Sequence, residues 1–262
     1  MSPGDHPRTA SHASHASSAS NASHASHWVR WHAPYEDPAS NLSRRLRTVQ
    51  GMVREVLDGI PVVADADPDA DAPPDPETFR IVSMCAGQGR DVIDVVAAHP
   101  RREAVSALLV ELHPDLVAFA RARAAAAGVD RQVRILEGDA AQSRWYADYV
   151  PADLVLVCGV FGNISAADRT RTIHALPGWC KPGAHVIWTR HRRPPDATPS
   201  IRAEFAAAGF TEVAFVAPED TVMTVGHHRL RADADTGAVV PAPPFDPATV
   251  LFDFVGDGCA PA

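Results

Sequence analysis

The chain has 262 residues, of which 46% are hydrophobic, and its 24 basic and 32 acidic residues give a formal net charge of −8. This length is sufficient for one sizeable α/β domain with appendages and a buried core. The acidic balance argues against a general nucleic-acid binder, because non-specific affinity for polyanions depends on a basic surface.

The first 27 residues form a low-complexity segment. A Ser-His-Ala pattern at residues 11–16 returns at residues 23–27, and it offers too little apolar surface to offset the entropy of the chain. We therefore expect a disordered tail over residues 1–27. The three-residue spacing of its histidines leaves metal collection open, but a neutral tail is the favoured interpretation.

An aromatic, irregular segment begins at Trp28 and leads into a predicted helix over residues 40–57, whose apolar residues recur at helical spacing. Ser40 or Asn41 can cap this helix. We expect residues 28–62 to form an N-terminal helical lid over a site in the following domain. An aromatic staple that pins the helix to a sheet is an equal alternative.

Residues 63–78 are acidic and rich in proline, which is typical of a solvated linker. Aspartates at alternate positions in this segment suggest calcium binding. However, the segment lacks the glycine and the terminal glutamate of an EF-hand loop, so the linker interpretation is preferred.

The stretch from Phe79 to Glu111 organises the rest of the chain. An apolar strand over residues 79–84 stops at the glycine turn Cys85-Ala86-Gly87-Gln88-Gly89, and a helical pattern begins at Arg90. A second apolar strand, residues 105–110, ends on Glu111. The glycines let the backbone approach a ligand closely, and a carboxylate at the next strand end can accept hydrogen bonds from two sugar hydroxyls. This pattern predicts a nucleoside-bearing cofactor.

Strands and helices alternate through the rest of the chain, with short connections. We predict helices from Pro114 to about Gly128, from 166 to 176 and from 200 to 208, strands over 133–136, 154–158, 185–189, 212–216 and 222–230, and a short edge strand over 250–255. Such alternation predicts a parallel sheet with helices on both faces. The last two long strands are too close in sequence for a parallel crossover, so they predict an antiparallel hairpin.

Seven strands with a glycine turn after the first and an antiparallel hairpin at the end resemble a class I S-adenosylmethionine-dependent methyltransferase of bacterial type. The likeness covers about residues 79–230 and places the catalytic domain at 79–262. It implies a seven-stranded Rossmann-like α/β sheet and S-adenosyl-L-methionine as cofactor. Ser83 and Cys85 depart from the usual first motif, which has an acid and a glycine at these positions.

The resemblance also implies which residues hold the cofactor. The glycine turn would wrap the methionine part, Glu111 with Leu112 the ribose, and Asp139 with Ala140 the adenine, while the loop from Cys158 to Asn163 would face the methyl group and the substrate. The implied cofactor-binding residues are Cys85, Ala86, Gly87, Gly89, Arg90, Asp91, Glu111, Leu112, Asp139, Ala140, Cys158 and Gly159.

Methyl transfer from a sulfonium depends mainly on alignment and desolvation, and a base is needed only when the acceptor is an acid such as a phenol. Asn163 and Tyr35 are candidates to orient the acceptor, and His113 and His191 are candidates for a base; Trp31 and His32 are weaker site candidates.

The acceptor is expected to be a small molecule, because the loop after residue 158 lacks the Asn/Asp-Pro-Pro-Tyr/Phe motif of enzymes that methylate bases. We expect no nucleic-acid partner, no membrane segment, no metal or disulfide among the four scattered cysteines, a cytoplasmic location, and a monomer or homodimer. Two alternatives stay open. One is an NAD(P)-dependent oxidoreductase, although Val92 replaces the third glycine of its motif. The other is a non-catalytic cofactor-binding protein.

Overall fold

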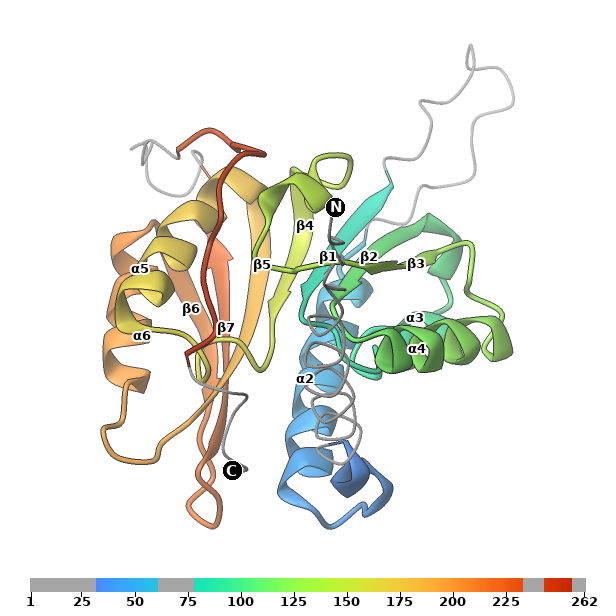
Figure 1. Cartoon of the computed structure of the whole chain (residues 1–262), viewed down its shortest axis with the longest axis horizontal. Coiled ribbons are helices and arrows are strands. Elements are labelled where there is room, and N and C mark those ends of the chain that lie inside the picture. Colours follow the sequence, from blue (N-terminus) through green and yellow to red (C-terminus); the bar gives the residue numbers. More distant parts are fainter. Residues whose placement is uncertain (1–31, 61–77, 233–242, 256–262) are drawn as a thin grey trace, which may run out of the picture.

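The computed structural model describes residues 32–60, 78–232 and 243–255 (Figure 1). The predicted tail over 1–27 lies outside these ranges, as do Trp28, Trp31, Cys259 and the linker predicted over 63–78 except for its last residue. Within the described ranges, no helix is long and apolar enough to cross a membrane.

A seven-stranded sheet forms the centre of the described chain, with the strand order β3-β2-β1-β4-β5-β7-β6. The strands are β1 (Phe79–Met84), β2 (Val105–Glu111), β3 (Val133–Glu137), β4 (Ala152–Val157), β5 (Cys180–His191), β6 (Phe210–Val216) and β7 (Met223–Leu230). Strands β1 to β5 pair in parallel, whereas β7 pairs antiparallel with both β5 and β6. The predicted parallel sheet with a terminal antiparallel hairpin is confirmed.

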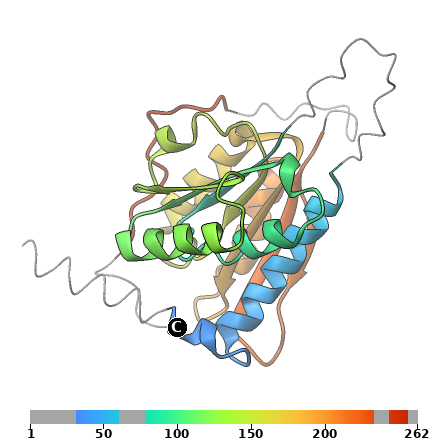
Figure 2. The ribbon, with the colours of Figure 1, turned by 90° about the vertical axis from the view of Figure 1, so that its right-hand side faces the viewer.

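Five α-helices cover the two faces of this sheet (Figures 1 and 2). They are α2 (Asn41–Asp58), α3 (Ile93–Ala98), α4 (Pro114–Ala126), α5 (Ala166–Ala175) and α6 (Thr198–Ala207), and short 3-10 helices lie at Ala33–Glu36 (η1), Arg102–Ala104 (η2), Ser143–Tyr146 (η3) and Leu176–Trp179 (η4). Apolar residues of α5 and α6 pack with one face of the sheet, and those of α2, α3 and α4 pack with the other. Successive strand residues point to opposite faces, so each strand contributes to both cores.

The N-terminal helix α2 begins as predicted, because the Ser40 hydroxyl accepts a hydrogen bond from the Ser43 backbone N–H at 3.1 Å. Its apolar side chains, among them Val53 and Leu57, are buried in the same core as Ile187 of β5 and Val225 of β7. Helix α2 is thus packed onto the sheet.

Three predicted boundaries are wrong. Helix α3 begins at Ile93 rather than Arg90, because the glycine turn continues through residue 92 before helical hydrogen bonds form. Strand β5 begins at Cys180 rather than at residue 185, and its pairing with β4 shifts register near its start. Residues 250–255 form no strand. Val250 makes an isolated bridge to Gln142 and Phe254 makes one to Ile164, while the side chains of Leu251 and Phe252 are buried in the core.

Candidate functional site

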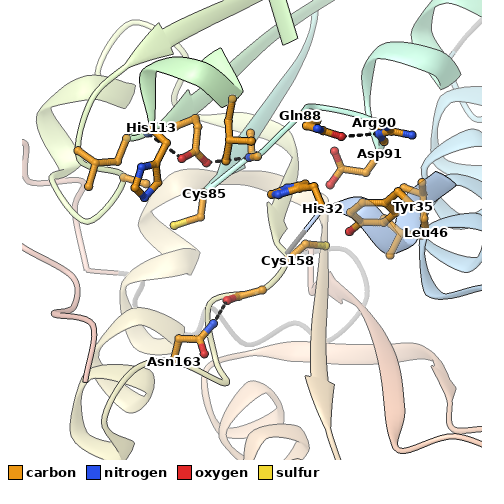
Figure 3. A pocket seen from close by; sticks show the side chains of 18 of the residues that line it. His32, Tyr35, Leu46, Cys85, Gln88, Arg90, Asp91, His113, Cys158 and Asn163 are labelled. Carbon is orange, nitrogen blue, oxygen red and sulfur yellow. Dashed lines mark hydrogen bonds between the residues drawn. The ribbon is translucent and has the colours of Figure 1, made fainter. Parts of the chain in front are cut away.

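A cavity of about 370 Å³ lies at the carboxyl ends of β1, β2 and β4, beneath η1 and the first half of α2 (Figure 3). The structure brings most of the predicted site residues together around it: Tyr35, Cys85, Ala86, Gly87, Arg90, Asp91, Glu111, Leu112, His113, Asp139, Ala140, Cys158, Gly159 and Asn163. The predicted residues Gly89 and His191 do not line it.

The glycine turn has the left-handed backbone that its sequence predicts, with φ of 51° at Cys85, 56° at Gly87 and 65° at Gly89. A Cβ added to Gly87 would lie 2.6 Å from the His32 Nε2 atom, so the turn lies close to the residue that precedes η1. Gly89 has a packing role: its Cβ would lie 2.8 Å from the Leu109 side chain of β2. The prediction that Gly89 contacts a ligand therefore gains no support.

Glu111 is fixed by backbone groups on two sides. Its Oε2 atom accepts a hydrogen bond from the Gly87 N–H at 2.8 Å, and its Oε1 atom accepts one from the His113 N–H at 2.9 Å. The residue is only 6% exposed, yet it lines the cavity. A carboxylate oxygen can accept more than one hydrogen bond, so Glu111 can still receive hydroxyl donors from a ligand.

Asp139 follows β3 on the same side of the cavity. Its Oδ1 atom accepts a hydrogen bond from the Ala141 N–H at 3.0 Å, and its Oδ2 atom accepts one from the Gln142 amide at 2.9 Å. Burial, together with the nearby carboxylates of Glu111 and Asp139, raises the pKa of the Cys85 thiol, so this thiol is neutral at physiological pH. The β2–β3 side therefore presents two acids and the exposed apolar side chain of Leu112.

The β4 side of the cavity carries the loop that follows Cys158. The Asn163 amide donates to the Gly159 carbonyl at 2.6 Å, and the Gly159 N–H donates to the Thr189 hydroxyl at 2.9 Å (Figure 3). Burial raises the pKa of the Cys158 thiol far above its usual range. These contacts fix the loop and leave a neutral thiol in the wall.

The short helix η1 is tied to the glycine turn by Arg90. The Arg90 guanidinium pairs with Glu36 of η1 at 2.5 Å, and it lies over the Tyr35 ring, 5.5 Å from the ring centroid. The Tyr35 hydroxyl accepts a hydrogen bond from the Arg45 Nη2 atom at 2.7 Å, and burial raises the pKa of this phenol. Segments that lie more than 30 residues apart in the sequence thus form one wall.

Seven residues that line the cavity were not predicted as site residues: Arg45, Leu46, Val49, Gln88, Leu116, Phe254 and Val255. Arg45 and Leu46 belong to the helix that was predicted as a lid, but periodicity alone does not tell which of its residues meet a cavity. Residues 254 and 255 were expected in an edge strand. The Val255 N–H instead donates to the Asn163 carbonyl at 2.9 Å, which places the C-terminal segment against the β4 loop.

His191 lies at the end of β5, outside the cavity, beside the Arg190 guanidinium at 3.2 Å. Burial and the neighbouring Arg190 lower its pKa. His113 lines the cavity on the Glu111 side, away from the β4 loop. The catalytic roles of both histidines stay predictions. No group of three or more His, Cys, Asp or Glu side chains within the described ranges is arranged to hold a metal ion.

Comparison with solved structures gives the same architecture in several proteins. Magnesium protoporphyrin IX methyltransferase from Synechocystis PCC 6803, solved with bound S-adenosylmethionine, is 14% identical over 85% of this chain and 100% of its own, with a TM-score of 0.58. The chain has the fold of a class I methyltransferase.

Two other structures with the class I methyltransferase fold are longer than this chain. An O-methyltransferase family protein from Burkholderia thailandensis is 16% identical over 78% of this chain, with a TM-score of 0.50. A protein of Nostoc punctiforme PCC 73102 described as a candidate O-methyltransferase is 16% identical over 70% of it, with a TM-score of 0.51. The chain spans 62% and 56% of these proteins, respectively. No protein-family model matches the sequence, and no curated protein matches it.

Proposed function

We propose that this chain binds S-adenosyl-L-methionine and transfers its methyl group to a small-molecule acceptor. The observation that carries the proposal is the convergence, in one cavity, of the glycine turn, the Glu111 carboxylate and the Asp139 carboxylate. The methyltransferase fold places these groups at adjacent strand ends, where open α/β sheets bind ligands.

The residues on the β2–β3 side fit a nucleoside. Glu111 is held so that it can accept the two ribose hydroxyls, Asp139 can accept the adenine amino group, and Leu112 can cover one face of the base. Gly87 lines the cavity and has no side chain, which lets a ligand approach its backbone. The fit rests on donor and acceptor chemistry, and it does not require Cys85 to be ionised.

When bound, S-adenosylmethionine supplies an electrophilic methyl group. The chain then has to align an acceptor with it and exclude water. The polar side chains of Asn163 and Tyr35 can orient the acceptor. The apolar side chains of Leu46, Phe254 and Val255 line the cavity as well. The Cys158 thiol is neutral, so we assign it a packing role rather than that of a base.

A small acceptor agrees with the shape and charge of the site. Residues of η1 and α2 line one side of the cavity, Phe254 and Val255 line another, and the chain is acidic overall. A polyanion such as RNA would need a basic approach surface. A small molecule with an apolar body fits the lining better.

Replacing Glu111 with glutamine should weaken binding of S-adenosylhomocysteine by about 1 to 3 kcal/mol, because it removes the charge from hydrogen bonds to the ribose. Isothermal titration calorimetry measures the change. Glu137→Gln is a matched control, since Glu137 pairs with Glu111 in the sheet register but does not line the cavity. Equal affinities of the Glu111 variant and the wild type would contradict the ribose assignment.

The cofactor itself is tested by titrating the wild-type protein with S-adenosylmethionine, S-adenosylhomocysteine and NADPH in parallel. We expect micromolar binding of the two sulfur nucleosides and none of NADPH. Binding of NADPH alone would support an oxidoreductase instead. A panel of phenols, amines and thiols, assayed for methyl transfer from labelled cofactor, then tests turnover.

A further inference from the structure

A second cavity, of about 350 Å³, lies between residues 41–48 of α2 and the hairpin of β6 and β7. The start of α2 and the β6–β7 loop lie at the same end of the molecule, where Arg44 pairs with Asp220 at 2.8 Å (Figures 1 and 2). Arg45 is the one residue that lines both this cavity and the cavity proposed to hold the cofactor. The second cavity is therefore a separate place at which a ligand can bind.

The face of α2 above this cavity is polar. Its residues recur at three- and four-residue spacing, so they lie along one face of the helix: Asn41, Arg44, Arg45 and Thr48. A helix face that covers a sheet is usually apolar. This holds further along α2, where Leu57 is fully buried in the core that also contains Val225 of β7. Packing of α2 onto the sheet thus does not account for the polar residues at its start.

The cavity is basic, although the chain has a net charge of −8. Three guanidinium groups line it, those of Arg44, Arg45 and Arg47, and no carboxylate among the described residues does. Arg44 pairs with Asp220 through both Nη atoms, but a guanidinium has five N–H donors, so donors remain for a ligand. Arg47 donates to the Pro38 carbonyl at 2.9 Å, a contact that leaves its charge in place. Such a local excess of positive charge attracts an anion.

The opposite wall of the cavity is apolar, and it consists of Val216, Pro218, Met223 and Val225. The loop in this wall is fixed by Arg192, whose Nη2 atom donates to the Pro218 carbonyl at 2.6 Å and to the Thr221 carbonyl at 2.9 Å. These bonds engage two carbonyl oxygens that would otherwise disfavour a bound anion. A bare inorganic ion would leave the apolar wall without a contact, whereas an anion with an apolar body uses both walls.

We propose that this second cavity binds a small organic anion, with its phosphate or carboxylate group against Arg44 and Arg47 and its apolar body against β6 and β7. The planar guanidinium groups suit both kinds of anionic group, because they can donate two parallel hydrogen bonds. The site goes beyond the proposed methyl transfer and does not depend on it, so binding is measured on the full chain without cofactor.

Phenyl phosphate is the probe, because it joins a phosphate to an apolar ring. By calorimetry, it should bind more tightly than inorganic phosphate, which lacks the ring, and more tightly than benzamide, which lacks the charge. Arg44→Gln and Arg47→Gln should each weaken its binding about three- to tenfold, and the double variant should weaken it further. Thr48→Phe keeps every charge but fills the cavity, so it should weaken phenyl phosphate more than inorganic phosphate.

Arg54→Gln is the matched control, because Arg54 is an exposed arginine of the same helix that lines neither cavity. It should leave the affinity unchanged, and circular dichroism checks that each variant is folded. The inference is overturned if phenyl phosphate does not bind, if the double variant binds it as tightly as the wild type, or if Arg54→Gln weakens binding equally. The titrations with sulfur nucleosides test the proposed function separately, so either idea can fail while the other stands.

Discussion

Replacing Gly226 with alanine should destabilise the protein by about 3 kcal/mol, the upper end of the usual cost of overpacking a core. Gly226 lies in β7 opposite Trp188 of β5, and an added Cβ would lie 2.2 Å from the Trp188 Cε2 atom. The indole has no room to move: it is fully buried, lies parallel to the Phe205 ring at 6.0 Å and donates to His228 at 3.1 Å. Thermal unfolding should show a melting temperature lower by about 10 °C.

A second glycine provides a control in which the same substitution should raise, not lower, the stability. Gly51 lies inside α2, and a Cβ there would meet nothing within 4 Å, so Gly51→Ala should stabilise the protein by about 0.5 to 1 kcal/mol through helix propensity. In the Gly226→Ala background, the smaller ring of Trp188→Phe should restore part of the lost stability. An unchanged melting temperature for Gly226→Ala would show that the indole can shift.

Asp91→Asn should stabilise the ligand-free protein at neutral pH by about 1 to 3 kcal/mol. Burial raises the pKa of Asp91 from 3.8 to about 6. The folded state therefore holds this proton more tightly than the unfolded state. The free-energy cost of ionising Asp91 in the folded state is absent below pH 3.8, grows as the pH rises to about 6 and stays constant above that pH. Asparagine keeps the shape of the side chain without the charge.

Urea denaturation of both proteins at several values between pH 4 and pH 8 measures this effect. The difference in unfolding free energy should be near zero at the acid end and largest above pH 6. A difference that does not depend on pH would contradict the raised pKa.

Much of the fold was predictable because it depends on local patterns. Strand β1, the glycine turn and strand β2 follow from an apolar run, two glycines that take positive φ and a second apolar run that ends on an acid. The antiparallel pairing of β6 and β7 follows from the short connection between them, since a parallel pair would need a crossover. The start of α2 follows from the hydroxyl of Ser40.

The wrong secondary-structure predictions concern residues whose conformation depends on tertiary contacts. The periodicity of apolar residues predicted that a helix starts at Arg90. This residue instead lies in the turn, where its guanidinium pairs with Glu36 of η1. The apolar run at residues 250–255 predicted a short edge strand. The structure gives them isolated bridges instead: the Leu251 and Phe252 side chains are buried in the α5–α6 core, and the Leu251 N–H donates to the Ala141 carbonyl after β3.

The sequence by itself determined the strand ends at which Glu111 and Asp139 stand and the turn that lets a ligand approach, because spacing and backbone freedom are local properties. Only the tertiary structure decided what completes the cavity. Arg45 comes from a helix some 40 residues before the turn, and Val255 from a segment more than 90 residues after the Asn163 loop that it contacts. Such contacts depend on the packing of α2 and the C-terminal segment against the sheet, which no pattern within either segment encodes.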